Sequence, residues 1–208
     1  MFDNSTIKFL YDNEKEALFH TIALDNSKYA IRNKAIFSIA EYAALRASEV
    51  GMLEISDLNL CSREIYFKRL KHSNPNTLRI LDSTVFRALT DYLAYRQENK
   101  ITNTTLFVSQ KGNPISRKTL DSMMKKYCHL AGITSEKAHF HTLKHTRAVE
   151  LANLGLDTKE IQYWLGHKSV KNTEIYFQFT TKQQETLYQK LTLYMDKHKM
   201  EEIYYDRN

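Results

Sequence analysis

Apolar residues recur every three or four positions through most of the chain, which is the period of a helix packed on one side. In the first third, this pattern predicts a short helix over 13–24 and a longer one that begins near Asn26 and Ser27. We expect the longer helix to lie at the centre of the molecule, because its apolar stripe is rich in small side chains: Ile31, Ala35, Ile36, Ile39, Ala43 and Ala44.

The pattern then changes. Residues 46–58 predict a restarted helix with Ser48 as its N-cap. Two β-rich runs, 64–70 and 76–82, flank the turn-forming sequence KHSNPN, which predicts an antiparallel hairpin. The run TLFVS at 105–109 precedes another turn and predicts a third strand.

Helical periodicity dominates the rest of the chain. It predicts helices over 83–99, 116–132, 141–154, 158–165, 172–179 and 181–204. Ser116 and Thr158 are the expected N-caps, and Gly132 is the expected C-terminal residue of its helix. Without repeats or a flexible linker, the chain predicts one mainly α (α+β) domain: a helical bundle with a small antiparallel three-stranded sheet.

The composition indicates a class of partner and a cellular compartment. The net charge of +6 and pI of about 9.1 suit a polyanion, either nucleic acid or an anionic membrane surface, although simple solubility is an alternative explanation. Cys61 and Cys128 lack metal-ligand spacing, and we expect both to be reduced thiols. The acidic N-terminal stretch excludes a signal peptide, and no apolar run approaches the roughly 20 residues of a membrane span. These features predict a cytoplasmic protein.

Three separated motifs carry candidate chemistry. ALRASEV at 44–50 places Arg46 three residues before Glu49, HTLKH at 141–145 opens a helix, and LGHKSVKNTEIY at 165–176 places His167 nine residues before Tyr176. Each motif alone has an ordinary explanation, such as a surface ion pair, structural histidines or a core tyrosine. Their order and spacing together resemble the tyrosine recombinases, also called the phage integrase family, from about Ile7 to Phe179.

The resemblance implies the fold of the catalytic domain of that family over residues 1–180. It also implies that the tail, 181–208, forms a helix that docks on a neighbouring protomer, with Leu187, Leu191, Tyr194 and Met195 on one face; packing within its own chain is the alternative. Arg46 lies too near the start for a separate N-terminal core-binding domain. In this respect the chain is similar to the short recombinases typified by fimbrial phase-variation invertases.

The resemblance also assigns roles that the chemistry supports. Attack of a tyrosine on a phosphodiester increases the negative charge on the non-bridging oxygens, which cationic donors stabilise. Arg46 can bind those oxygens through its planar fork, and Glu49 can orient that fork. His141 acts as a donor or a general acid–base, His167 donates to a phosphate oxygen, and Tyr176 is the nucleophile.

A hairpin lysine protonates the leaving 5′ oxygen in this family. Lys68 and Lys71 both flank the turn, and Lys71 matches the family position better; a solvated hairpin lysine is the alternative. We also expect Lys68, Arg69, Arg147 and Lys168 to contact DNA. The partners implied are double-stranded recombination sites and further copies of the chain in a tetramer. Neither a metal ion nor another cofactor is implied.

The chain departs from the family at Lys144, where a second phosphate-binding arginine is expected. Lysine keeps the charge but loses the bidentate fork. Loss of one such contact would slow the reaction by about 30- to 200-fold, at roughly 2–3 kcal/mol. Arg147, one turn further along, is predicted either to reach back and replace the missing guanidinium, or to snorkel outward or pair with a carboxylate.

Three functions compete at this point. The leading one is a site-specific DNA recombinase that works through a 3′-phosphotyrosine intermediate in inversion, excision or integration. The second is a catalytically weakened relative that binds DNA as an accessory protein, which only Lys144 favours. The third is an enzyme similar to type IB topoisomerases, which shares the chemistry but needs no paired sites.

Overall fold

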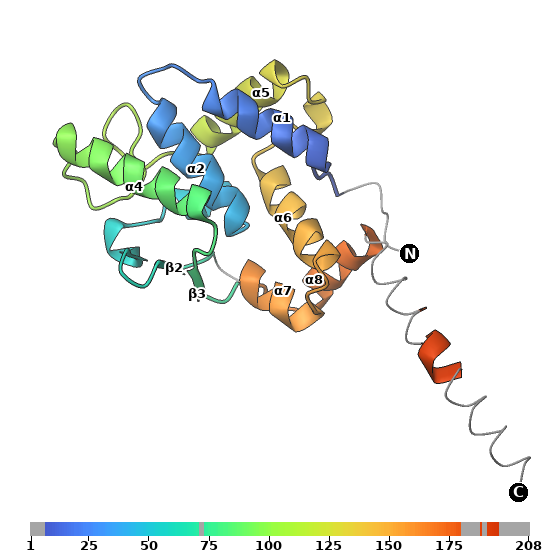
Figure 1. The fold of residues 1–208 in the computed structure, drawn as a ribbon. Helices are drawn as coiled ribbons and strands as arrows, with labels where there is room; N and C mark the ends of the chain where they lie inside the picture. The colour runs from blue at the N-terminus through green and yellow to red at the C-terminus, as the bar shows by residue number, and fades with distance from the viewer. Residues whose placement is uncertain (1–6, 71–72, 180–187, 189–190, 196–208) are drawn as a thin grey trace, which may run out of the picture.

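The computed structural model describes residues 7–70, 73–179, 188 and 191–195. Within these residues the chain forms a helical molecule with a small sheet at one side (Figure 1). The helices are α1 (Asp12–Ala23), α2 (Ala30–Tyr42), α3 (Ala47–Val50), α4 (Ser83–Glu98), α5 (Arg117–Leu130), α6 (His141–Asn153), α7 (Thr158–Leu165) and α8 (Lys171–Glu174). Short 3-10 turns are η2 (Ile55–Asp57), η3 (Ser135–Lys137) and η4 (Ile175–Phe179).

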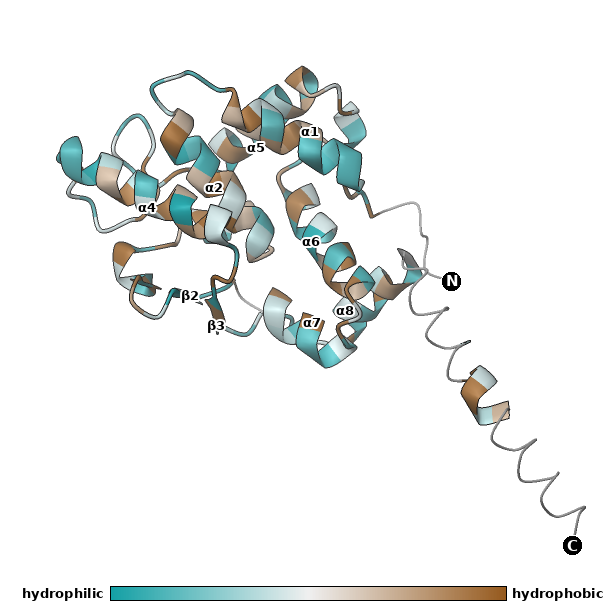
Figure 2. Cartoon of the chain, viewed as in Figure 1, coloured by the Kyte–Doolittle hydropathy of each residue, from teal (hydrophilic) through white to brown (hydrophobic). Residues whose placement is uncertain are grey.

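The centre of the molecule is α2, as the alanine-rich stripe predicted. It packs against α4 and α6, and α1 also lies against it. Almost every residue between Ala35 and Leu45 is fully buried. Colouring by hydropathy shows brown positions turned toward the interior and teal positions outward on the surrounding helices (Figure 2).

The sheet has three antiparallel strands in the order β1 (Leu58–Asn59), β2 (Glu64–Phe67) and β3 (Asn76–Arg79). The hairpin of β2 and β3 confirms the first two predicted strands, which are shorter than expected. Ile65 faces Leu78 across the hairpin, and both are buried against the helices. This register leaves the intervening turn free to reach toward α7.

The third predicted strand is wrong. Residues 105–109 form only single bridges, between Thr105 and Glu54 and between Val108 and Pro114. Leu106 and Phe107 are buried as a core-filling loop, and the third strand is β1 instead. The apolar pattern of this run correctly indicated that it is buried. It could not indicate strand pairing, because pairing depends on a partner strand elsewhere in the chain.

Two predicted caps are also wrong. Arg46, not Ser48, occupies the N-cap of α3, and the Glu49 carboxylate accepts its backbone N–H at 2.9 Å. Asp157, not Thr158, caps α7, because its carboxylate accepts from the backbone N–H groups of Lys159 and Glu160, at 2.7 and 2.8 Å. The predicted helix over 46–58 is accordingly broken into α3, η2 and β1.

The helix predicted to begin near Asn26 and Ser27 begins later, at Ala30, whereas several other boundaries agree with prediction. Ser116 caps α5 by accepting from Thr119 N–H at 3.1 Å, and Gly132 adopts a positive φ of 72° just after that helix. The helix predicted over 172–179 corresponds to α8, which begins at Lys171, followed by η4. Most of the predicted tail helix lies outside the described residues. No helix in the described part of the chain is both long and apolar enough to span a membrane.

Candidate active site

Arg46 reaches the site through a tight turn between α2 and α3. Ala44, two residues after α2, lies in the left-handed region with a φ of 52°, and Leu45 N–H donates to Ala40 O at 2.8 Å. Ala44 N–H also donates to Glu41 O at 3.1 Å, and these two backbone hydrogen bonds reverse the chain within two residues. The Arg46 guanidinium then donates from Nη1 to Glu49 Oε1 and to Ser73 Oγ, both at 3.0 Å.

Glu49 is the carboxylate on which several cations converge. It is buried, and besides Arg46 it accepts from Arg69 Nη1 at 3.3 Å and from Leu70 N–H at 3.3 Å. Burial alone would raise the pKa of Glu49, but the Arg46 N–H and the charges of Arg69 and Lys144 hold that pKa below its ordinary value. One carboxylate therefore serves three cations, which leaves the region electropositive.

The prediction that Arg69 contacts DNA is wrong. Its side chain is fully buried and donates to Glu49, to Asn76 Oδ1 at 2.9 Å and to the backbone carbonyls of Ala43 and Trp164. A guanidinium carries five donors, and this one ties β2 to the ends of α2 and α7. Arg69 is thus part of the frame behind the site and is screened from any DNA surface.

Gly166 allows the hairpin to approach α7. It ends α7 with a φ of 64°, and an added Cβ would lie 2.7 Å from Asn74 O. Asn74 N–H donates to Gly166 O at 2.8 Å, and Ser73 bridges to His167. Lys71 lies outside the described residues, but Leu70 and Ser73 on either side of it contact Glu49 and Arg46.

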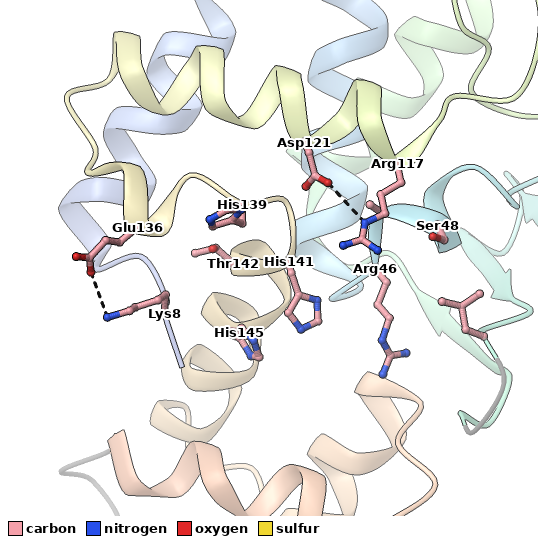
Figure 3. Close-up of a pocket in the computed structure, with 12 residues that line it drawn as sticks. Lys8, Arg46, Ser48, Arg117, Asp121, Glu136, His139, His141, Thr142 and His145 are labelled. Atoms are coloured by element: carbon pink, nitrogen blue, oxygen red, sulfur yellow. Dashed lines mark ion pairs between the residues drawn. The ribbon is translucent and has the colours of Figure 1, made fainter. Parts of the chain in front are cut away.

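The N-terminal half of α6 forms one wall of a pocket of about 550 Å³ (Figure 3). His141 and His145, one turn apart, project from this wall, and Arg46 faces them from the opposite side. Their rings meet edge to face with centroids 4.4 Å apart. The pocket is lined by more bases than acids: Lys8, Arg46, Arg117 and three histidines against Asp121 and Glu136.

Lys144 does not line this pocket, although the sequence placed it facing DNA. The side chain is 1% exposed and donates from Nζ to Leu165 O at 3.2 Å. Burial and the neighbouring Arg46 lower the pKa of Lys144 to about 7. Lys144 therefore lies behind the surface of the pocket and does not reach into it.

Tyr176 is held at the back of the pocket wall. It is 2% exposed, and its hydroxyl lies 3.0 Å from Nδ1 of His145. The His167 ring lies nearly parallel to the Tyr176 ring, with centroids 6.4 Å apart, while His167 Nδ1 is 3.0 Å from Thr173 Oγ1. The structure thus brings His141, His145, His167 and Tyr176 together with Arg46.

His141, His145 and His167 are all neutral at neutral pH, and for the same reasons. Burial first, and then the charges of Lys144 and Arg46, lower the pKa of His141 to about 4. Burial and nearby positive charge also lower the pKa values of His145 and His167, each to about 3. Burial raises the pKa of Tyr176, so its proton stays on the phenol in this state. An incoming anion would oppose the lowering of the three histidine pKa values, and it would raise the pKa of Tyr176 further.

Arg147 pairs with a carboxylate, as the second of the two predictions for it stated. It donates to Glu150 at 3.2 Å and lies over the rings of Tyr42 and Trp164. Arg147 does not line the pocket. It therefore does not replace the missing guanidinium there, and the prediction that it contacts DNA is not met at this pocket. Lys68 and Lys168 are exposed; Lys68 pairs with Glu54 at 3.0 Å.

Sequence reasoning missed His145 and Arg117. His145 follows His141 by four residues, which places both on one helix face, and that spacing could have revealed it. Arg117 begins α5, and only the fold brings it to the pocket. Among the described residues, no group of three or more His, Cys, Asp or Glu side chains is placed to hold a metal ion.

Comparison with known proteins identifies the family and the fold of this chain. The model of the phage integrase family matches residues 8–183. The type 1 fimbriae regulatory protein FimB of Escherichia coli K12 is 34% identical over 175 residues, which cover 84% of this chain and 86% of FimB. Tyrosine recombinase XerC of Listeria innocua is 31% identical over 189 residues, 88% of this chain and 61% of XerC.

Solved structures show the same fold. The XerA recombinase superposes with a TM-score of 0.75 at 28% identity over 89% of this chain and 64% of XerA. The XerH recombinase, bound to its palindromic difH substrate after cleavage, gives a TM-score of 0.74 at 25% identity, over 86% of this chain and 52% of XerH. The chain therefore spans less than two thirds of XerC, XerA and XerH. The predicted fold class and family resemblance are confirmed.

Proposed function

Because the chain belongs to the phage integrase family, we propose that it is a tyrosine-type site-specific recombinase, which cleaves DNA and rejoins it. The observation that carries this proposal is the convergence of Arg46 and His141 on a pocket, with Tyr176 behind its wall in contact with His145. A phosphodiester needs cationic and hydrogen-bonding donors as its charge grows, and a nucleophile within reach.

Arg46 is the main phosphate ligand in this proposal. Nη1 is occupied by Glu49 and Ser73, and these two contacts orient the planar fork while the side chain still lines the pocket. Preorganised donors stabilise a transition state without reorganising during the reaction. His141 and His167, both neutral, donate further hydrogen bonds to the phosphate oxygens.

Tyr176 attacks phosphorus and forms a 3′-phosphotyrosine, releasing the 5′ oxygen. Exchange of one phosphate ester for another conserves bond energy, so religation requires no ATP. Lys71 protonates the leaving oxygen, a role supported by the position of its neighbours Leu70 and Ser73 at Glu49 and Arg46. Lys144 adds positive potential from behind the site in place of the bidentate contact of an arginine.

We also propose the larger assembly that the sequence predicted. Residues 1–180 act as the catalytic domain, and 181–208 dock on a neighbouring protomer in a tetramer on double-stranded DNA. Leu191, Tyr194 and Met195 are exposed, as a surface for a partner requires. Removal of 181–208 should leave single-site cleavage and abolish higher-order complexes on DNA, measured by light scattering. An unchanged tetramer would contradict this role.

One experiment tests the enzymatic function. The protein is incubated with random-sequence duplexes, each nicked within the random segment so that cleavage releases a short strand and cannot reverse. Adducts that resist detergent are captured, and their DNA is sequenced. We expect an enriched sequence with the wild type, no adduct with Tyr176→Phe, and wild-type yield with Tyr95→Phe, which removes a hydroxyl on α4 away from the pocket.

The same assay addresses the alternatives. Binding of DNA without any adduct would favour an accessory DNA-binding protein. Adducts on all sequences alike, with relaxation of supercoiled DNA that lacks the enriched sequence, would favour the topoisomerase-like activity. The retained Arg46, His141, His167 and Tyr176 support the recombinase.

A further inference from the structure

The contact between Tyr176 and His145 has no role in the scheme above. We propose that His145 is a catalytic residue that accepts the hydroxyl proton of Tyr176 when the phenol attacks DNA, and that the bound phosphate itself switches this acceptor on. This inference rests on the proposed function and adds a proton acceptor and its regulation to the same site.

The chemistry requires such an acceptor. As Oη of Tyr176 bonds to phosphorus, its O–H bond breaks and the proton moves to Nδ1 of His145. The bond between phosphorus and the 5′ oxygen breaks, and its electron pair remains on that oxygen, which takes a proton from Lys71. Atoms and charge balance, and His145 leaves the step as an imidazolium that returns its proton during religation.

Geometry selects His145 among the three histidines. Its Nδ1 is the ring nitrogen 3.0 Å from Tyr176 Oη. His167 presents its ring face to the tyrosine ring, and its Nδ1 is engaged by Thr173. The His141 ring packs edge to face on the ring of His145, with centroids 4.4 Å apart. Only His145 thus lies within hydrogen-bond reach of the reacting oxygen.

The second nitrogen of His145 explains how DNA would switch the acceptor on. With Nδ1 accepting from the phenol, the proton of the neutral ring is on Nε2. His145 also lines the pocket, whereas Tyr176 does not, so the ring lies between the nucleophile and the space for a phosphate. A phosphate oxygen that accepts from Nε2–H would stabilise the imidazolium, as the carboxylate does in a Ser-His-Asp triad.

Without DNA, the charges around His145 oppose this transfer. The titratable groups that face it are His141 and Lys144 on α6, Arg46 before α3, and His167 and Tyr176 on the segment that follows α7. The cations and burial keep His145 a weak base, and burial keeps Tyr176 a weak acid, so the nucleophile stays protonated. A bound anion offsets the cationic charge and raises the basicity of the ring.

The test uses His145→Asn on the full chain, with the duplex that wild type selects from the random library. Asparagine places an oxygen near Nδ1, which keeps an acceptor for the phenol but cannot take its proton. The matched control is His129→Asn, an exposed histidine at the end of α5. Single-turnover cleavage is followed between about pH 6 and 8, with and without added imidazole. A second substrate carries sulfur in place of the bridging 5′ oxygen, so that its leaving group needs no acid.

We expect His145→Asn to cleave about 100-fold slower or more, with unchanged DNA affinity and thermal stability. The rate of His145→Asn should rise with pH and should stay low on the sulfur substrate, because a better leaving group does not replace a base. In a second variant, His145→Gly, added imidazole should restore part of the cleavage rate. His129→Asn should match wild type.

Other outcomes overturn the proposal. Cleavage by His145→Asn at the wild-type rate or faster would mean that His145 only holds Tyr176 back. Rescue by the sulfur substrate would make His145 part of the acid. If wild type itself forms no adduct on any duplex, both the recombinase function and this role of His145 fail together, whereas a normal wild-type adduct isolates the failure to His145.

Discussion

At the scale of single residues, charge at this site is managed by one carboxylate and a layer of buried cations. Glu49 is the shared partner of Arg46 and Arg69, and Lys144 adds a third positive charge nearby. A buried cation without a full partner weakens the folded state. The arrangement therefore favours a polyanion at the expense of stability in the free protein, as is common at binding sites.

Replacing Lys144 by methionine should reveal this trade. We expect Lys144→Met to raise the free energy of unfolding at pH 7 by about 1–4 kcal/mol, because an apolar side chain of similar length suits the buried position better than a charge. DNA cleavage should slow about 100-fold through loss of positive potential. Urea unfolding and adduct formation measure the two effects, with exposed Lys159→Met as the control.

The stability difference should depend on pH. The folded protein holds the proton of Lys144 only below about pH 7, whereas the unfolded chain holds it up to about 10.5. Between these values the unfolded state binds more protons, so wild type gains stability as pH rises. The advantage of Lys144→Met should be largest below pH 7 and should shrink toward 10.5. A pH-independent difference would show that Lys144 keeps its proton in the folded protein across this range, so that burial does not lower its pKa.

At the scale of elements, the site depends on the hairpin turn docking on the end of α7. Gly166 makes this possible, since it combines a left-handed backbone with contact to Asn74 O and the Arg69 side chain. The docked turn in turn places Ser73 on Arg46. The close approach at Gly166 thus brings together the hairpin turn, the Arg46 motif and the segment that contains His167.

Gly166→Ala tests this docking. Alanine in the left-handed region costs about 1–2 kcal/mol, and the close contact with Asn74 O adds roughly 1–3 kcal/mol. Gly155→Ala is the matched control: its φ is 89°, but the added methyl group meets nothing within 4 Å. Urea unfolding should show a larger loss for Gly166→Ala. Equal losses would mean that backbone strain alone matters and that the hairpin can move aside.

At the scale of the whole molecule, positive charge extends from the pocket onto α5. Arg117 lines both the active-site pocket and an adjoining hollow formed with Lys118 and Lys125. The Arg117 side chain is 77% exposed and only loosely paired with Asp121 at 3.6 Å. We expect this surface to follow the DNA backbone beside the cleavage site.

Arg117→Ala should therefore weaken duplex binding and reduce the slope of log affinity against log salt by about 1, as expected for one lost phosphate contact. Arg87→Ala, an exposed arginine on α4, should leave both unchanged. Fluorescence anisotropy with a labelled duplex at several salt concentrations measures the slope. The same slope for both variants would place DNA elsewhere.

The fold was largely predictable from periodicity because most elements are amphipathic helices. The errors fell where local pattern is weak: the four-residue α3, the two-residue β1 and the core loop at 105–109. Ser48 is a good N-cap by type, yet Arg46 takes the place because Glu49 binds its N–H and guanidinium together. Tertiary contacts outweigh local preference in elements this short.

The sequence by itself determined the family chemistry: the residue types at 46, 141, 167 and 176, their order, and the departure at Lys144. It also determined the helical framework, since a 3.6-residue apolar period is a local property. Only the tertiary structure decided that Arg69 and Lys144 lie inside, that Arg147 turns to Glu150, and that His145 meets Tyr176. The physical reason is that burial and hydrogen-bond partners depend on which distant segments pack together, and the spacing of residues along one segment does not encode those partners.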